Sequence, residues 1–490
     1  MKKTSLTTAV IAGIAGVAGI SNMASAVYLN NDGLGQVLIY PYYTVNAGNS
    51  TAITVVNTTG FAKAVKVRFL EAFDSREVLD FNLYLSKFDY WSAQVVPVGA
   101  GAGVFSADNS CTVPNLPKTA GTAYPFSTAA FDGQIATSPN DGGPKTAPRT
   151  LEGYVELIDM GTLNNNVKSS AAAATHSAGV PASCAQLNAA WVPGTGYWSN
   201  DPTIDISLIY GGLFGSGTIV NVALGTIEGY NADAIDQFYA ANDLVVHHTA
   251  PTTLSPSIAS ATARTSYVFA PVSAGGTAAL VTTPYLLGVD AVSSLFMADA
   301  VYNEYWTAGG TAANSEWVVN FPTKRFYVDP SLVGAVRAPF EVRFSAAAGG
   351  TSCAAIAISV FDREEGSPQG SVGFSPQPVT GNSLCYEAQV VTFNQSKTPS
   401  AVLGSNLAAN IATGYNNGWA KIDLVSAAPA LAPHTLSSPA SANVFYGLPV
   451  TGFWVAQLVN GNLGGVLSNY SSLYRHKLHR TCATAAGACS

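Results

Sequence analysis

Charged residues are scarce in this chain. Asp, Glu, Lys and Arg make up 10% of its 490 residues, against about 25% in an ordinary soluble domain. The formal net charge is −7, and the only grouped cations lie between Arg475 and Arg480. Because nucleic-acid binding needs clustered cations, we expect no nucleic-acid partner. A surface with so few charges repels its neighbours weakly and tolerates extensive contact with them.

Long apolar runs and catalytic motifs are also missing. Beyond the first 26 residues, no stretch reaches the ~18 uninterrupted apolar residues of a membrane-spanning helix. The chain has no Gly-x-Ser-x-Gly elbow, no His-Glu-x-x-His helix and no phosphate-binding loop. It also has no repeat of fixed period, which argues against a solenoid or propeller. These absences favour a protein that is not an enzyme and needs no cofactor.

The N-terminus has the three parts of a secretory signal. Met1, Lys2 and Lys3 are followed by an apolar run at residues 6–20 and by Ala24-Ser25-Ala26. We therefore predict a signal peptide over residues 1–26, cleaved before Val27. Loss of the two lysines makes the mature net charge −7 − 2 = −9. The mature protein is expected outside the cytoplasm of a Gram-negative-type cell, at the cell surface or beyond it rather than in the periplasm.

Six cysteines remain after export, an even number in an oxidising compartment. Pairing neighbours along the chain gives Cys111–Cys184, Cys353–Cys385 and Cys482–Cys489, although other connectivities are open. His476 and His479 lie close to the last pair, so a zinc site of two His and two Cys is an alternative there. Since exported thiols are normally oxidised, the disulfide is the preferred interpretation.

The sequence pattern of the mature chain predicts an all-β protein, built mainly of antiparallel, Ig-like β-sandwich domains with long loop excursions and few short helices. Residues 35–45 are apolar on both alternating faces, which is typical of a strand covered on two sides. The predicted strands of the first half are 35–45, 51–57, 64–73, 78–85, 90–98, 151–158, 203–210 and 218–227. Excursions are expected at 99–150 and 163–200, with helices at 184–191 and 233–241.

A Ser/Thr/Pro-rich stretch at residues 249–264 is the best candidate for a domain boundary. It divides an N-terminal β-sandwich region, residues 27–250, from a C-terminal β-rich region, residues 251–490. The predicted strands of the second region are 316–320, 325–328, 340–344, 354–361, 386–393 and 445–459.

Several segments resemble a family of secreted, cell-surface, β-rich proteins of Gram-negative bacteria. The similar segments are GQVLIYPYY at 35–43, KVRFLE at 66–71, SREVLDFN at 75–82, WVVNFPTKR at 317–325, GLPVTGF at 447–453 and LSNY at 467–470. The resemblance implies a location and a β architecture. It brings no catalytic motif and implies no reaction.

Other candidate groups have ordinary structural interpretations. Acidic clusters at residues 71–77 and 362–365 contain paired carboxylates, as a glycosidase would, but charged turns between strands are the preferred interpretation. Asn30-Asn31-Asp32 offers oxygen ligands for Ca²⁺ without the spacing of a calcium loop. His247-His248 is expected in a surface loop. Two aromatic clusters would stack on sugars if exposed, but core positions are favoured; they are Tyr40, Tyr42, Tyr43, Tyr84, Tyr90 and Trp91, and Tyr302, Tyr305, Trp306 and Trp317.

We therefore expect an exported structural protein, a subunit of a surface layer, sheath or extracellular filament that associates with itself or with other surface components. The alternatives are a carbohydrate-binding surface protein and an extracellular hydrolase of unrecognised type. An N-terminal strand has no preceding element to tether it, so it can pair with a neighbouring subunit. Val37, Ile39, Tyr40 and Tyr43 are the candidate contacts for such pairing; alternatively, the strand fills its own sandwich.

Overall fold

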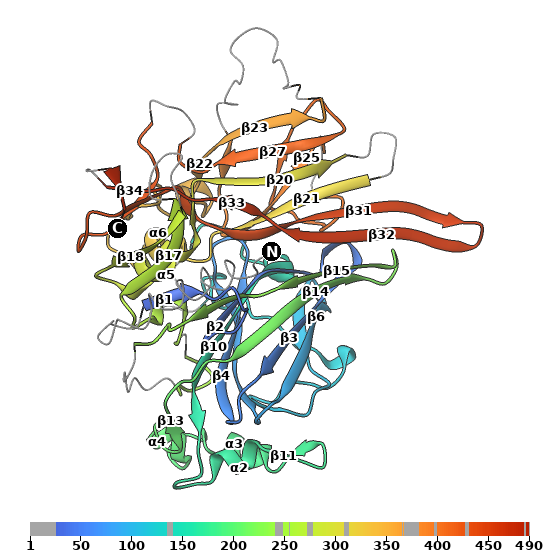
Figure 1. Ribbon diagram of the computed structural model, residues 1–490. Helices are drawn as coiled ribbons and strands as arrows, with labels where there is room; N and C mark the ends of the chain where they lie inside the picture. The colour runs from blue at the N-terminus through green and yellow to red at the C-terminus, as the bar shows by residue number, and fades with distance from the viewer. Residues whose placement is uncertain are drawn as a thin grey trace, which may run out of the picture.

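Antiparallel strands dominate the computed structural model of the protein (Figure 1). The structure describes residues 26–134, 141–240, 248–253, 255–271, 278–307, 313–364, 366, 382–395, 399–426, 431–484 and 487–489. Except for Ala26, the predicted signal peptide lies outside the described residues. The all-β, sandwich-like fold with few short helices is confirmed.

The largest sheet has ten strands drawn from residues 26–284. Its order is β18-β17-β1-β16-β2-β10-β4-β5-β8, with β13 paired to β10. The strands are β1 (Ala26–Leu29), β2 (Val37–Thr44), β4 (Lys63–Glu71), β5 (Glu77–Leu85), β8 (Cys111–Val113), β10 (Glu152–Leu163), β13 (Ile206–Ser207), β16 (Asp233–Asp236), β17 (Thr265–Pro271) and β18 (Ala278–Pro284). β2 lies between β16 and β10 and is buried along its whole length, as its doubly apolar sequence predicts.

A six-stranded sheet packs against the first and completes a sandwich. Its order is β15-β14-β3-β6-β7-β9. The strands are β3 (Asn49–Asn57), β6 (Tyr90–Val98), β7 (Gly101–Phe105), β9 (Tyr124–Pro125), β14 (Leu213–Asn221) and β15 (Thr226–Asn231). Alternate residues of β3 are buried, which is the pattern of a strand with one face on a core. That core joins Tyr40 and Val67 of the first sheet to Ile53 and Trp91 of the second.

Two further sheets come from the second half of the chain. The third sheet has the order β23-β27-β20-β33 and the fourth β26-β25-β21-β31-β32. The third sheet consists of β20 (Ala300–Trp306), β23 (Ala357–Asp362), β27 (Asn417–Asp423) and β33 (Lys477–His479). The fourth consists of β21 (Ala313–Asn320), β25 (Ala388–Phe393), β26 (Ala408–Ile411), β31 (Thr451–Leu463) and β32 (Val466–Arg475). Between these two sheets, the Phe393 ring lies 5.0 Å from Tyr305 and 5.2 Å from Trp317.

The fourth sheet is covered on both faces, and this joins the two halves of the chain. Trp317 belongs to the core shared with the third sheet, whereas Val318 and Phe453 belong to the core of the first sandwich. Phe453 stacks on Tyr230 of β15 at 5.1 Å. The first sheet also crosses the predicted boundary, because β17 pairs with β1. The division expected at residues 250/251 therefore does not separate two bodies.

Short elements complete the fold. Small sheets are formed by β11 (His176–Ser177) with β12 (Val180–Pro181), β19 (Met297–Ala298) with β30 (Leu448–Pro449), β22 (Ala354–Ala355) with β24 (Ser383–Leu384), and β28 (Thr435–Ser437) with β29 (Val444–Tyr446), β34 (Cys482–Thr484) and β35 (Gly487–Ala488). The α-helices are α2 (Ser170–Ala174), α3 (Cys184–Ala189), α4 (Tyr197–Asn200), α5 (Gly288–Phe296) and α6 (Arg325–Val328). Helix α3 confirms the helix predicted at 184–191.

Several local predictions are wrong. Residues 233–236 form strand β16 rather than a helix, because Ala234 and Ile235 pair with Leu38 and Val37 of β2. Residues 325–328 form the helical turn α6 instead of a strand. Residues 340–344 form no strand; the two phenylalanines at its ends are buried without ladder pairing. The strand predicted at 203–210 shrinks to β13.

Candidate functional site: an uncharged projecting arm

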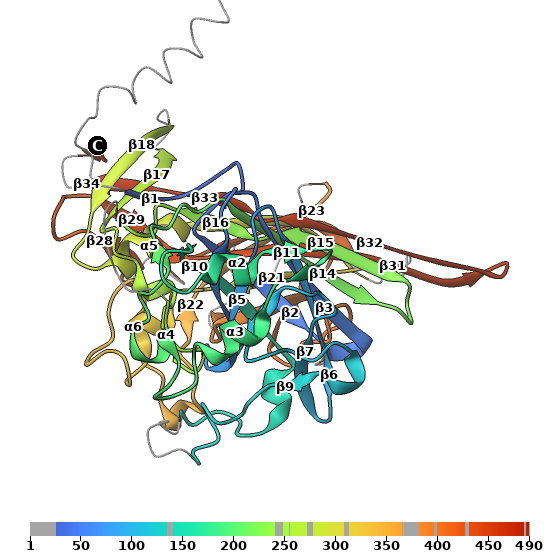
Figure 2. The same ribbon diagram turned by 90° about the horizontal axis from the view of Figure 1, so that it is seen from below.

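A β-hairpin projects from the body of the molecule. Strand β31 pairs with β21 as far as Leu458, which faces Ala313. Farther out, the ladder continues between β31 and β32. Both views show this hairpin reaching beyond the other labelled elements (Figures 1 and 2). We call its outer part, residues 459–470, the arm.

Glycines set the turn at the end of the arm. Leu463 faces Val466, so Gly464 and Gly465 form a two-residue turn between them. Their φ angles are 62° and 89°, as a turn with two left-handed residues requires. Such turns match the right-handed twist of the flanking strands, and glycine adopts them without steric cost. The sequence therefore builds a tight hairpin that can stand clear of the body.

The arm is apolar and carries no charge. Residues 451–474 contain no Asp, Glu, Lys or Arg. On the arm, Leu463, Val466, Leu467 and Tyr470 are each between 50% and 65% exposed. On the neighbouring β14–β15 hairpin, Val222 is 83% and Ile227 63% exposed. We call these six side chains the arm surface. Because Leu463 pairs with Val466 and successive side chains alternate, Leu467 lies on the opposite face of the arm from these two, so both faces of the arm carry exposed apolar side chains. Exposed large apolar side chains on both faces of a projecting element are typical of an interaction site.

The β14–β15 hairpin forms hydrogen bonds with the base of the arm. The Ser471 hydroxyl accepts a hydrogen bond from the Ile227 amide at 3.1 Å and donates to the Ile227 carbonyl at 3.0 Å. The Asn469 amide donates to the Leu224 carbonyl at 2.7 Å. Strands β15 and β32 are the outermost strands of their sheets, so two sheet edges meet here. Strand edges are the part of a sheet that most readily pairs with another chain.

The acidic cluster at residues 71–77 forms the turn between β4 and β5, as expected, but its side chains are buried. Arg149 lies 3.0 Å from Glu71 and 2.7 Å from Asp141, while Arg76 reaches Asp329 at 3.2 Å. Burial would raise the pKa of Glu71, but Arg149 holds it below its ordinary value. Partners from distant segments cover the cluster. Its carboxylates hold the fold together and do not line an open cleft.

The second acidic cluster is an exposed turn, as expected, and the asparagine-rich segment also forms a turn. Arg363 and Glu364 follow the end of β23, and their side chains are mostly exposed; residue 365 lies outside the described residues. The Asn30 side chain accepts a hydrogen bond from the Asp32 amide at 3.0 Å, which closes a turn.

The histidines near the C-terminus are engaged in other contacts. The His476 ring lies 2.8 Å from the Val318 carbonyl, and the His479 ring lies 2.8 Å from Asp299. Cys482 is bonded to Cys489. In the ranges given above, no three or more His, Cys, Asp or Glu residues are grouped to hold a metal ion.

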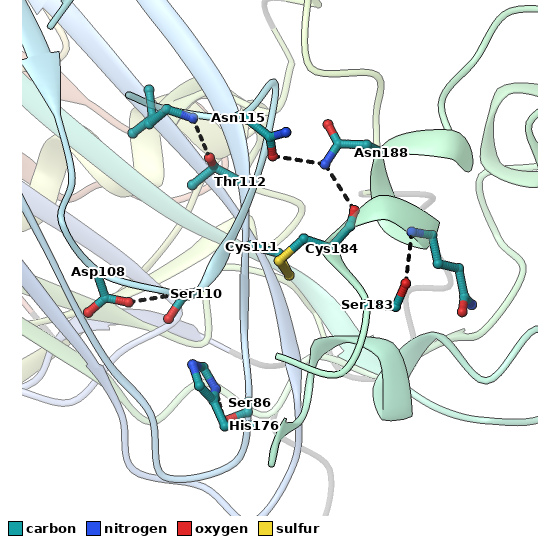
Figure 3. Close-up of a disulfide and its surroundings, with 12 residues drawn as sticks. Ser86, Asp108, Ser110, Cys111, Thr112, Asn115, His176, Ser183, Cys184 and Asn188 are labelled. Carbon is teal, nitrogen blue, oxygen red and sulfur yellow. Dashed lines mark hydrogen bonds between the residues drawn. A yellow bond between two sulfur atoms is a disulfide. The ribbon is translucent and has the colours of Figure 1, made fainter. Parts of the chain in front are cut away.

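All six cysteines are paired as neighbours along the chain: Cys111–Cys184, Cys353–Cys385 and Cys482–Cys489. Figure 3 shows the first pair, which fastens α3 to β8; beside it, the Asn188 amide donates to Asn115 at 3.0 Å. Across the described part of the chain, no helix has the length and apolarity to cross a bilayer.

Most of the predicted aromatic clusters are core. Tyr40, Tyr42, Tyr43, Tyr84, Trp91, Tyr305 and Trp317 are fully buried, whereas Tyr302 and Trp306 are partly exposed and Tyr90 is 53% exposed. His248 is also buried, so the surface loop expected for it is wrong; His247 lies outside the described residues.

The four candidate assembly residues are not on the surface. Val37, Ile39, Tyr40 and Tyr43 are all fully buried, because β2 pairs on both sides within its own sheet. The structure therefore agrees with the alternative expectation, in which this strand, β2, is part of the core of its own sandwich. Our sequence reasoning treated the apolar stretch at 445–459 as a strand and missed the arm that extends it. The uncharged run from 451 to 474, with Gly464-Gly465 at its centre, was the available signal.

Comparison of the chain with protein-family models, with curated proteins and with solved structures finds no match. The case for a function therefore depends on the geometry described above.

Proposed function

We propose that this chain is an exported structural protein of the cell surface whose copies assemble through the arm into a surface layer, sheath or filament. The arm surface is the observation that carries the proposal. Its six exposed apolar side chains gain free energy when they leave water, by about 25 cal/mol for each Å² of apolar area buried. On a projecting arm, these side chains can be buried by contact with another copy of the protein.

The projecting position of the arm and its lack of charge support assembly into an open polymer. A projection on one side of the molecule meets a different surface on its neighbour, and such head-to-tail contacts produce filaments or layers when they do not close into a ring. The lack of charge on residues 451–474 leaves little repulsion between copies. Three disulfides are typical of a protein that works in an oxidising compartment. We propose no enzymatic activity, since the larger carboxylate cluster is buried and held by arginines.

Charged substitutions on the arm test the proposal. Replacing Leu467 and Tyr470 together by lysine should abolish assembly, because lysine on a sheet edge opposes pairing with another chain. The free energy of unfolding should change by less than about 0.5 kcal/mol, as for most surface substitutions. Sedimentation and negative-stain electron microscopy of the purified mature protein provide the measurement.

The matched control is Leu332→Lys, which adds a charge at a side chain that is 48% exposed. Leu332 is far from the arm in sequence and closely follows α6, a helix on the side of the molecule opposite the tip of the arm (Figures 1 and 2). This variant should assemble like the wild type. Polymers formed equally well by the double-lysine variant would overturn the role of the arm. A wild-type protein that stays monomeric at every concentration would overturn the structural function itself.

A further inference from the structure

The third sheet turns one face to the core and the other outward. On β20, Val301 and Tyr305 are fully buried, and on β27 Ala420 and Ile422 are fully buried. Because side chains alternate along a strand, the residues between them point away from the core. The outward face therefore carries Tyr302 and Glu304 on β20, Asn417, Trp419 and Lys421 on β27, and Phe361 on β23. At the end of β20, Trp306 is partly buried and its ring lies 5.3 Å from Trp454 of the fourth sheet.

Aromatic rings form a platform on this face. Glu304, Trp419 and Phe361 lie directly opposite one another across the three strands. The Trp419 ring stacks on Phe361 with centroids 4.2 Å apart and planes at 15°, and Tyr302 lies 6.4 Å away. Trp419 is nevertheless 41% exposed, the only tryptophan among the large apolar side chains recorded as exposed in the described ranges. Its position is fixed by Phe361 while part of its ring remains open to solvent.

Polar groups converge beside this platform. A pocket of about 510 Å³ is lined by Glu304, Trp306, Asp362, Arg363, Asn417 and Trp419. The lining thus combines two indole rings with two carboxylates, an amide and a guanidinium. Pockets of this size bind small ligands when a few placed polar groups accompany apolar and aromatic walls.

We propose that this pocket binds a carbohydrate. A pyranose ring has an apolar face of C–H groups, which packs on an indole ring, and a rim of hydroxyls. Carboxylate oxygens accept hydrogen bonds from those hydroxyls, and amide and guanidinium groups donate to them. An apolar peptide or a second apolar sheet would leave the same polar groups without partners, which is costly. The pocket is also lined by Ala313 and Leu458 of the fourth sheet, but none of the six side chains of the arm surface lines it. The proposed sugar site can therefore be tested separately from the proposed assembly.

A glycan array carrying neutral and amino-sugar oligosaccharides, probed with the mature protein, tests the proposal, and calorimetric titration of the best binder gives the dissociation constant. Trp419→Ala should weaken binding at least tenfold, and the nearly isosteric Glu304→Gln at least threefold. Tyr90→Ala removes an aromatic ring of β6 that is somewhat more exposed than Trp419, and this variant should bind as the wild type does. The double-lysine arm variant should also bind normally, which separates this site from assembly.

Circular dichroism decides which variant is informative: if Trp419→Ala is misfolded, Glu304→Gln carries the test. An array on which no oligosaccharide binds would overturn the proposal. It would equally be overturned if the folded pocket variants bound with wild-type affinity, or if Tyr90→Ala weakened binding as much as they do.

Discussion

At the scale of single residues, many of the few charges of this protein lie in its interior. Lys63 lies 2.7 Å from Asp159, and Arg68 lies 2.6 Å from Glu77; all four side chains are less than 10% exposed. Removing one partner of such a buried pair costs about 3–5 kcal/mol, because the other charge is left uncompensated. These ion pairs join neighbouring strands of the first sheet. They also leave the outer surface with even less charge than the composition indicates.

His248 predicts a loss of stability in acid. Its ring is fully buried, 2.9 Å from the Tyr84 hydroxyl and packed on Trp198. Burial lowers the pKa of His248 from 6.5 to about 3. Between these values only the unfolded chain takes up the proton, so the free energy of unfolding falls as the pH falls. Between about pH 7 and about pH 4.5 this one group should lower the free energy of unfolding by about 2–3 kcal/mol.

Urea denaturation of the wild type and His248→Phe at the two pH values measures this effect. The variant should be less stable at neutral pH but lose about 2–3 kcal/mol less on acidification. Trp191→Phe is the control, because Trp191 donates to the same Tyr84 hydroxyl at 2.8 Å but does not titrate. It should lower stability equally at both pH values. An unchanged acid response in His248→Phe would contradict the assignment.

At the scale of single elements, local sequence predicts strands well and their surroundings poorly. The strands predicted at 51–57, 78–85 and 90–98 coincide closely with β3, β5 and β6, because alternation and turn residues are local signals. Alternation along β4 also predicts that Lys66 and Arg68 lie on one face of the strand and that Val65 and Val67 lie on the other. This alternation does not indicate that both faces of β4 are buried. The face that carries Lys66 and Arg68 is covered by a segment almost 200 residues later in the chain, where the Pro251 carbonyl accepts a hydrogen bond from Lys66 at 3.3 Å.

The same limit applies to the sites. Neighbour pairing of the cysteines was one of several connectivities that the sequence left open, and the structure shows that it is the one formed. The arm could not be predicted from the sequence, because an apolar strand in the core and an apolar strand in solvent have similar sequences. Only the fold shows that β31 extends beyond the end of its pairing with β21. Trp419 is similar, since its exposure depends on how β20, β23 and β27 assemble.

The central position of β2 predicts that it cannot be removed. Deleting residues 27–45 takes away the strand between β16 and β10, together with Tyr42, whose hydroxyl donates to Glu152 at 2.7 Å. The truncated chain should be unfolded, with the near-ultraviolet circular dichroism lost. As a control, an Asn-Gly turn can replace residues 459–469 between Leu458 and Tyr470, which already face each other. That variant should stay folded; a folded monomer without residues 27–45 would show that β2 is dispensable.

At the scale of the whole molecule, the sheets form successive layers with shared cores. The third sheet covers one face of the fourth, and the sandwich of the first two covers the other. A strand that is internal to such a stack cannot be exposed without disturbing the layers on both sides. The projecting arm is different, because beyond Leu458 the described β31 and β32 residues pair only with each other, apart from the Asn469 side-chain contact with the β14–β15 hairpin. The arm is therefore the element most suited to contact another copy.

The layered arrangement predicts that the two halves of the chain unfold together. Calorimetry of residues 27–490 should show one transition, and a fragment of residues 27–250 expressed alone should not fold. That fragment would lack β17 and β18, which continue the first sheet beyond β1, and it would lack Phe453, which stacks on Tyr230. The exposed core would make the fragment aggregate or remain without fixed tertiary contacts. Two separate transitions, together with a soluble fragment that forms the Cys111–Cys184 disulfide and retains near-ultraviolet circular dichroism, would show instead that the first sandwich is an independent unit and that the fourth sheet only rests on it.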